Sequence, residues 1–268
     1  MPVIDTGEVK LAYERSGSGP PLLLIMGMSG TFSHWAEPFL DELRASFEVI
    51  VYDHRGVGQS SPLQGELTIA GLAQDAVGLL GALDLDSAHV LGISMGGMVA
   101  QELALARPER IRTLALGCTY CGGPGSSLAS PEVIQRLAAG MSSGDRALAV
   151  RTAWEVNVSP AFDAAHPDAF ETFRAIGMTR AVAVPVIMAQ MQACAAHDTS
   201  ARLPQLQLPT LVAHGTLDLM IPVANAAIIH RLIPGSQLEI LDGLGHLFFW
   251  EQPQRAAALV RDHAAVGV

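Results

Sequence analysis

Short apolar runs alternate with longer amphipathic stretches over most of the chain, and this alternation constrains the fold more than any other feature. Residues 9–15 form an opening run of alternating polarity. Six brief, largely apolar runs follow it, at residues 22–26, 47–52, 89–93, 112–116, 210–213 and 237–241. Such runs are typical of strands buried on both faces, and buried strands that alternate with helices form parallel sheets. We therefore predict a three-layer α/β/α fold, in which helices cover both faces of a mostly parallel sheet.

Amphipathic periodicity predicts helices between these strands, at residues 35–45, 69–83, 95–106, 223–232 and 254–263. One interval interrupts the alternation. Between about residues 121 and 203 there is no convincing strand, and helical patterns occur at 132–139, 146–156, 169–176 and 187–196. Because the strand alternation resumes directly after this interval, we predict a helical insertion within a single domain that spans residues 1–268.

The charge and the cysteine content indicate the environment of the protein. The net charge is −10 and Lys10 is the single lysine, so no basic cluster is available to neutralise a row of phosphates. The apolar run at residues 22–26 is far shorter than the roughly 20 residues of a membrane span, and the opening MPVIDTGEVK does not resemble an export signal. Three cysteines cannot all pair within one chain. We expect a cytoplasmic protein that binds neither nucleic acid nor membranes, and the oligomeric state is not indicated.

The cysteines also allow a metal-site hypothesis. Cys118, Cys121, Cys194 and His197 form a C-x-x-C and a C-x-x-H pair, which is a set of residues that can bind zinc. However, Cys118 ends an apolar strand and Cys194 lies in an alanine-rich helical stretch. Small buried thiols explain these positions more simply, so we predict no metal.

A serine between two glycines stands where a predicted strand meets a predicted helix. The strand at residues 89–93 leads directly into the helix at 95–106, so Ser94 occupies a turn of almost no length within the motif G-x-S-x-G. In a nucleophile elbow, small residues on either side let strand and helix cross closely and expose the hydroxyl at the carboxyl edge of the sheet. The alternative is that Ser94 only caps its helix. A second match, around Ser142, lies inside the helical insertion and follows no strand, so we do not predict a catalytic role for it.

A serine nucleophile needs a base and an acid that orients the base. Of the nine histidines, His246 lies just after the last strand in a glycine-flanked loop, and we predict that it is the base. Asp218 follows the strand at 210–213 and precedes the histidine in chain order, which is the order typical of an α/β sheet enzyme with this elbow. Asp242 is the main alternative acid, and its position four residues before the histidine favours a role in the loop. His214 ends the strand before Asp218 and is a candidate to support the acid.

Two backbone amides are predicted to bind the oxyanion that forms on the substrate. One is the N–H of Met95, directly after the serine, and the other is the N–H of Met28 in the loop after the first core strand. Gly27 allows that loop to turn sharply, although Gly27 and Gly30 are also consistent with a simple turn.

These motifs resemble those of the α/β-hydrolase superfamily, within the branch of serine carboxylesterases, enol-lactonases and cofactor-free haloperoxidases. The resemblance extends over nearly the whole chain and depends on LLLIMGM, YDHRGVGQS, LGISMGGMVAQ, HGTLDLMIP and GLGHLFFWEQP in the family's order. It implies an eight-stranded sheet with a helical lid inserted after the sixth strand. It also implies that the DHRG loop at residues 53–56 is mainly structural. The chain departs from many relatives at Met26, where they have histidine; methionine there resembles some methylesterases of polyketide tailoring.

The resulting hypothesis is hydrolysis of a carboxylic ester or lactone of a small, largely apolar substrate, through an acyl-enzyme on Ser94. Four methionines are candidates to line the substrate pocket, although helical methionines also serve as core residues: Met178, Met188, Met191 and Met220. No dinucleotide fingerprint, P-loop or H-E-x-x-H motif occurs, so we predict no cofactor. The alternatives are a cofactor-free haloperoxidase or perhydrolase, a C–C bond hydrolase with the same triad, and a non-catalytic small-molecule receptor.

Overall fold

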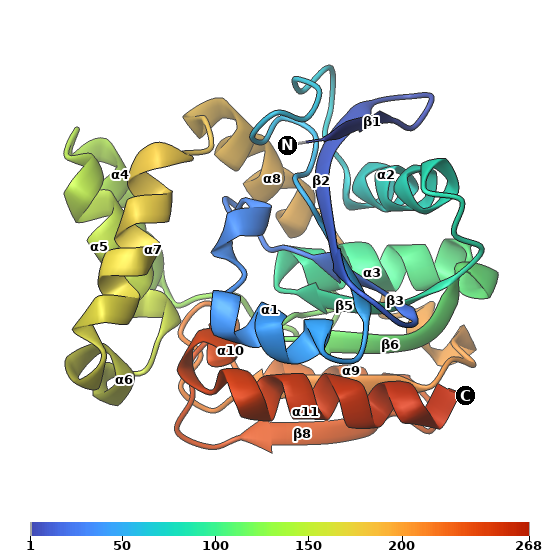
Figure 1. Cartoon of the computed structure of the whole chain (residues 1–268). Helices are drawn as coiled ribbons and strands as arrows, with labels where there is room; N and C mark the ends of the chain where they lie inside the picture. Colours follow the sequence, from blue (N-terminus) through green and yellow to red (C-terminus); the bar gives the residue numbers. More distant parts are fainter. Residues whose placement is uncertain (1, 268) are drawn as a thin grey trace.

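A computed structural model describes residues 2–267 and contains one eight-stranded sheet in the order β1-β2-β4-β3-β5-β6-β7-β8 (Figure 1). From β4 to β8 all neighbours are parallel, while β1 and β2 are antiparallel to their neighbours. This confirms the predicted mostly parallel sheet. The strands are β1 (Val3–Asp5), β2 (Lys10–Gly17), β3 (Pro21–Ile25), β4 (Glu48–Tyr52), β5 (Ala88–Ile93), β6 (Ile111–Gly117), β7 (Thr210–Gly215) and β8 (Gln237–Leu241).

The two edge strands differ from what their local sequence predicts. Periodicity missed β1, because it has only three residues and none of them is fully buried. The prediction that residues 237–241 form a fully buried strand is wrong. β8 is the outer strand, with only β7 beside it, and Leu241 is its one buried residue. An edge strand has one face and one side open to solvent, and the position of a strand in the sheet is not encoded in its own pattern.

Helices cover both faces of the sheet, as predicted. The two helices α2 and α3 pack together on one face with α9, and their apolar side chains form one buried cluster with the strands. The helices α1 and α11 pack together on the other face and form a second cluster. Their bounds are α1 (Glu37–Arg44), α2 (Ile69–Ala82), α3 (Met95–Ala106), α9 (Ala224–Leu232) and α11 (Pro253–Ala264).

The predicted helical insertion is confirmed between β6 and β7, where five helices project from the carboxyl edge of the sheet (Figure 1). Two short helices were not predicted, α6 and α10 (Phe248–Glu251), because one or two turns are too short to establish a helical period. The insertion helices are α4 (Pro131–Ser142), α5 (Arg146–Asn157), α6 (Pro160–Ala165), α7 (Pro167–Thr179) and α8 (Val184–Ala195).

The insertion is anchored in both buried clusters of the domain. Trp154 of α5 and Phe173 of α7 are part of the cluster on the α1 and α11 face. Ala193 and Cys194 of α8 belong to the cluster on the α2 and α3 face. Its helices are also joined to one another by polar contacts, since Asp163 of α6 accepts hydrogen bonds from Trp154 Nε1 at 2.7 Å and from Arg151 Nη1 at 2.9 Å.

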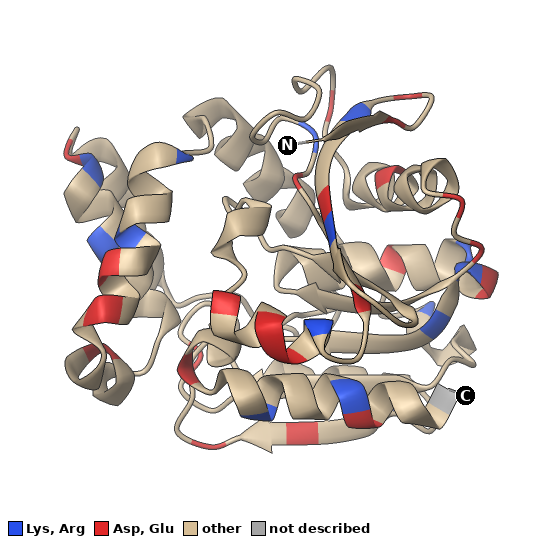
Figure 2. Cartoon of the chain, in the orientation of Figure 1, with Lys and Arg blue, Asp and Glu red and all other residues tan. Residues whose placement is uncertain are grey.

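Charged residues of both signs are interspersed along the outer elements (Figure 2). Among the described residues, no single helix has the length and apolar character to cross a bilayer. Only α7 and α8 taken together reach those limits of length and composition, and a bend of 108° separates them.

Candidate active site

Ser94 lies at a sharp turn between β5 and α3, as the motif predicts. Its backbone has φ 58° and ψ −122°. For a residue other than glycine, this conformation carries a strain energy of about 1–3 kcal/mol. Two hydrogen bonds hold this conformation. The N–H of Ser94 donates to Gly117 O at 2.9 Å, and Thr119 Oγ1 donates to Ser94 O at 2.7 Å. The end of β6 therefore fixes the strained turn that presents the serine.

The flanking glycines are required by close backbone contacts. A Cβ atom on Gly92 would lie 2.2 Å from Gly96 O, and a Cβ atom on Gly96 would lie 2.0 Å from Ile25 O. Both distances are far below any van der Waals contact, and the obstructing atoms are backbone carbonyl oxygens that cannot rotate away. The strand, the helix and the end of β3 thus meet at a spacing that excludes side chains, as the predicted elbow requires.

We expect Gly96→Ala to lower the free energy of unfolding by at least about 3 kcal/mol, because the added methyl group meets a rigid carbonyl. Gly81→Ala is the matched control, since a Cβ atom at this helical glycine of α2 has no heavy atom within 4 Å. The control is expected to unfold within about 1 kcal/mol of the native chain. Urea unfolding measures both variants, and equal stability of the two would contradict the close approach.

The strand register brings the ends of β5, β6 and β7 to one edge. Ile93 pairs with Gly117, and Gly117 pairs with Ala213, so the three strands end level with one another. Ser94 therefore follows one strand end while Asp218 follows another, two strands away. The loop after β8 completes the group, because His246 Nδ1 lies 2.7 Å from Asp218 Oδ2. The structure thus joins the predicted base to the predicted acid.

Asp218 is buried, and hydrogen bonds occupy both of its carboxylate oxygens. Oδ1 accepts from the N–H groups of Met220 at 2.8 Å and Ile221 at 2.9 Å, while Oδ2 lies 2.7 Å from His246 Nδ1 and 3.1 Å from His214 Nε2. Burial alone would raise the pKa of Asp218. Interaction with the two imidazoles outweighs burial and holds the pKa of this carboxyl below its usual range. Asp218 is therefore an ionised group that can orient His246 and stabilise its protonated form.

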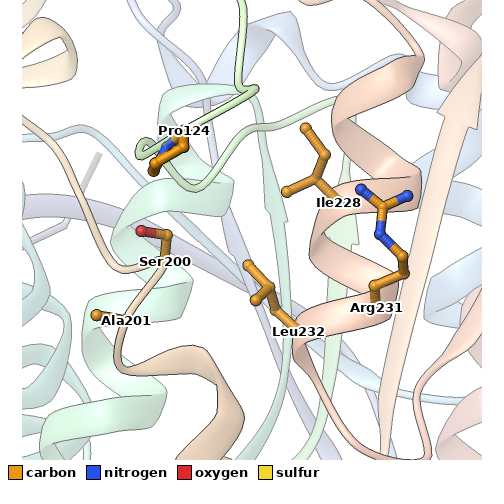
Figure 3. A pocket seen from close by; sticks show the side chains of 6 residues that line it. All are labelled: Pro124, Ser200, Ala201, Ile228, Arg231 and Leu232. Atoms are coloured by element: carbon orange, nitrogen blue, oxygen red, sulfur yellow. The ribbon is translucent and has the colours of Figure 1, made fainter.

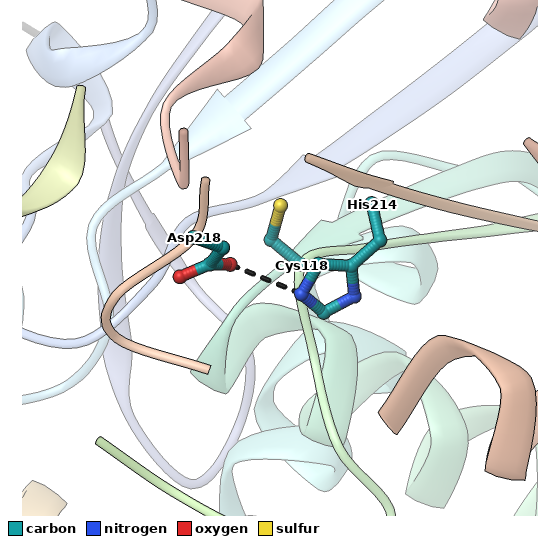
Figure 4. Close-up of side chains that lie close together, drawn as sticks. All are labelled: Cys118, His214 and Asp218. Carbon is teal, nitrogen blue, oxygen red and sulfur yellow. Dashed lines mark ion pairs between the residues drawn. The ribbon is translucent and has the colours of Figure 1, made fainter. Parts of the chain in front are cut away.

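Cys118, His214 and Asp218 form a buried group with ligand atoms within 4.8 Å of one another (Figure 4). Such side chains can bind a metal ion, but hydrogen-bonding groups already surround both oxygens of Asp218, and burial raises the pKa of the Cys118 thiol. The arrangement fits a support for the acid better than a metal centre. Within the described residues, Cys121, Cys194 and His197 do not join this group, so the four residues of the zinc hypothesis do not assemble.

The loop that carries His246 is held by a residue that the sequence analysis missed. Glu251 Oε1 accepts from Gly245 N at 2.7 Å and from Ser159 N at 3.1 Å, and Oε2 accepts from the Ser159 hydroxyl. Ser159 caps α6, so the carboxylate links the histidine loop to the insertion. Burial raises the pKa of Glu251, and these hydrogen bonds oppose the shift. Its signal in the sequence was an acidic residue directly after an apolar FFW segment.

The Ser94 hydroxyl and the His246 imidazole do not form a hydrogen bond with one another in the structure of residues 2–267. The backbone segments that carry these two side chains both contact the end of β6 or the residue after it, since Ser94 N donates to Gly117 O and Cys118 Sγ lies 4.0 Å from Gly245 O. A nucleophile and its base are often poorly aligned before substrate binds. Asp242, the alternative acid, accepts from Thr216 Oγ1 at 3.2 Å and therefore ties the loop together, as expected.

The loop after β3 lies directly over the serine. A Cβ atom on Gly27 would be 3.1 Å from Ser94 Cβ and 3.6 Å from Ser94 Oγ. The amides of Met28 and Met95 have no hydrogen-bond partner among the described residues, so both N–H groups are available to an oxyanion.

Side chains from the DHRG loop hold the loop after β3. His54 Nε2 lies 3.0 Å from Met26 O, and Asp53 Oδ1 accepts from Phe32 N at 2.7 Å. These contacts agree with the structural role that the resemblance implied for this loop. A further contact comes from the insertion and has no local signal in the sequence: Gln190 Oε1 accepts from Ser29 N at 2.9 Å.

The predicted methionines differ in their exposure. Met178, Met188 and Met191 are more than one third exposed on the insertion helices, while Met220 is partly buried against the core. Their role in substrate binding stays a prediction. These methionines line neither of two surface hollows. One of about 290 Å³ lies between the start of the insertion and α9, and Figure 3 shows its six lining residues: Pro124, Ser200, Ala201, Ile228, Arg231 and Leu232. The other, of about 390 Å³, lies between α6 and the histidine loop.

Known proteins match the chain over most of its length. A family model described as alpha/beta hydrolase fold matches residues 20–151. RutD of Azorhizobium caulinodans, which is named as a putative carbamate hydrolase, is 31% identical over 248 residues and 92% of each chain. A poly(3-hydroxyalkanoate) depolymerase of Ectopseudomonas oleovorans is 29% identical over 90% of this chain and 82% of its own.

Solved structures show the same similarity. A hydrolase from Pseudomonas aeruginosa superposes with a TM-score of 0.84 at 31% identity, over 98% of this chain and 97% of its own. The enol-lactonase from Burkholderia xenovorans superposes with a TM-score of 0.85 at 26% identity, over 98% of this chain and all of its own.

Proposed function

Because the chain belongs to the alpha/beta hydrolase fold family, we propose that it is a serine hydrolase that cleaves a carboxylic ester or lactone of a small, largely apolar substrate. The observation that carries the proposal is the hydrogen-bonded pair of His246 and Asp218 at the same sheet edge as the strained Ser94 turn. The similarity to an enol-lactonase supports the same bond class.

Each residue has a defined part in the proposed reaction. His246 removes the proton of Ser94 as its Oγ attacks the acyl carbonyl, and Asp218 stabilises the imidazolium that forms. The amides of Met28 and Met95 bind the oxyanion, and the loss of one such donor typically lowers kcat by about 10²- to 10³-fold. The protonated His246 then donates its proton to the leaving alcohol. Water, activated by the same imidazole, releases the acid from Ser94.

Hydrolysis of a carbamate is a second candidate, favoured by the similarity to RutD. A carbamate offers the same acyl carbonyl to Ser94, but its nitrogen lowers the electrophilicity of that carbonyl. The two candidates therefore share the nucleophile and differ in the substrate that is turned over fastest.

The test measures acyl-enzyme formation and substrate choice together. We expect p-nitrophenyl butanoate to give a burst of nitrophenol equal to the enzyme concentration or a steady Ser94-dependent turnover, and a lactone to compete with it. A fluorophosphonate should modify Ser94 and leave Ser142 unmodified, as read by mass spectrometry of peptides. Faster turnover of carbamates than of every ester would favour the second candidate. No modification of Ser94 and no turnover of either class would contradict the proposed hydrolase.

A further inference from the structure

Gln190 is a fully buried polar residue on the insertion helix α8. Its exposed fraction is zero, and its neighbours on the same buried face of the helix are Val186 and Ala193. A carboxamide on an otherwise apolar helix face needs partners, because a buried polar group without a hydrogen bond is destabilising. One partner is the backbone of the loop after β3, through Ser29 N.

The contact with Ser29 fixes the orientation of the carboxamide. A backbone N–H is a donor, so the atom that faces it at 2.9 Å must be the carbonyl oxygen of the side chain. The NH₂ group therefore lies on the other side of the carboxamide. Among the described residues this Nε2 has no hydrogen-bond partner, although it is buried. A donor left unpaired in this way costs about 1–3 kcal/mol.

The loop that Gln190 holds is the one that lies over the nucleophile. Ser29 follows Met28, whose amide is free, and Gly27 before it approaches Ser94 Cβ. Covalent geometry and the 2.9 Å contact place Nε2 within about 9 Å of the Met28 amide nitrogen. Other buried atoms also lack partners, and one of them, His54 Nδ1, belongs to a ring that contacts the same loop at Met26 O. A neutral imidazole that donates to this carbonyl through Nε2 leaves Nδ1 as an acceptor, whereas Gln190 Nε2 is a donor.

We propose that Gln190 is a substrate-binding residue. Its carbonyl oxygen holds the loop after β3, and its free N–H donates to a second oxygen of the bound substrate. This inference rests on the proposed hydrolysis at Ser94. It narrows the substrate class to esters or lactones whose acyl part carries an oxygen acceptor within a few atoms of the scissile carbonyl. An acceptor there pairs the donor that the protein alone leaves unpaired, so such a substrate gains an interaction that an all-carbon acyl chain does not make.

The test compares four p-nitrophenyl esters of equal length: the hexanoate and its three analogues in which an ether oxygen replaces the methylene at acyl position 3, 4 or 5. The preference for each oxygen is its kcat/KM divided by that of the hexanoate. The variant is Gln190→Met, which keeps an unbranched side chain of similar size. Gln192→Met is the matched control, since Gln192 is exposed on the same helix. Each preference is compared between the native chain and a variant. Because the same two esters are used in both, differences in their intrinsic reactivity cancel.

We expect the preference for at least one ether position to fall about three- to tenfold in Gln190→Met and to stay unchanged in Gln192→Met. Loss of the Ser29 contact alone would lower the rates of all four esters by one common factor, so it does not move the preference. Unchanged preferences at all three positions would overturn the proposal.

If Gln190→Met does not fold, the native enzyme supplies the test. Its preferences are then compared with the rate ratios of the same four esters in hydroxide without protein, and preferences no higher than those ratios would overturn the proposal. Absence of Ser94-dependent turnover of every ester would instead overturn the proposed function, and the role of Gln190 with it.

Discussion

Ser94→Ala is expected to lower kcat/KM for p-nitrophenyl butanoate by about 10⁴- to 10⁶-fold, the range typical of removing a triad nucleophile. The variant keeps the oxyanion amides and the His246–Asp218 pair, so only the acyl-enzyme route is lost. The backbone contacts of Ser94 with Gly117 and Thr119 do not involve its hydroxyl. We therefore expect the midpoint of thermal unfolding to change by no more than a few degrees.

Ser142→Ala is the matched control for this prediction, because Ser142 is the serine of the second G-x-S-x-G match. Ser142 lies at the end of α4, is exposed, and donates its hydroxyl to Ala139 O at 3.3 Å. It has no strained turn and no strand behind it. Its loss should leave kcat/KM unchanged, and activity that survives Ser94→Ala but not Ser142→Ala would reverse the assignment of the nucleophile.

Asp218→Asn is expected to lower kcat/KM by about 10⁴-fold, the second largest effect. Oδ1 can still accept from Met220 N and Ile221 N, so the loop should keep its shape. The new NH₂ group would face His246 Nδ1, and the imidazole would then present the wrong tautomer to Ser94. Asp242→Asn is the control, since that carboxylate bonds only Thr216 among the described residues. A loss below about tenfold in Asp218→Asn would contradict its role as the triad acid.

The same substitution should change the acid dependence of stability. The pKa of Asp218 in the folded protein is below its usual value, so as the pH falls the unfolded state takes up this proton first. The ionised Asp218 carboxylate stabilises the fold at pH values above its pKa in the unfolded state, which is about 4. This stabilisation is lost as the pH falls through the lower pKa that Asp218 has in the folded state. The carboxamide introduced by Asp218→Asn does not titrate. The free energy of unfolding of this variant should therefore fall less steeply below pH 4 than that of the native chain, as measured by urea unfolding.

The parts of the site that sequence predicted are those with local signals. The elbow around Ser94 requires small residues two positions before and after it, and that requirement is visible as G-x-S-x-G. Asp218 and His246 follow neighbouring parallel strands, whose carboxyl ends lie at one edge of the sheet. Periodicity indicates the strands, whereas their register is seen only in the structure. The contact between Asp218 and His246 could be predicted because both follow strand ends at the same edge.

The parts that sequence did not predict depend on contacts between distant segments. Gln190 bonds Ser29, 161 residues away in the chain, and Glu251 bonds Ser159, 92 residues away. No local period encodes how the insertion packs on the sheet. The exposed face of β8 was missed for the same reason, because the place of a strand in the sheet order depends on all the other strands.

The double anchoring of the insertion opposes its movement as one rigid body. Helices α5 and α7 are fixed by Trp154 and Phe173 in one hydrophobic layer, and α8 by Ala193 and Cys194 in the other. Lifting all five helices as one rigid flap would expose both aromatic rings to water, at a cost on the order of 5 kcal/mol. Movement of the insertion as one body therefore has to break its packing in both hydrophobic layers.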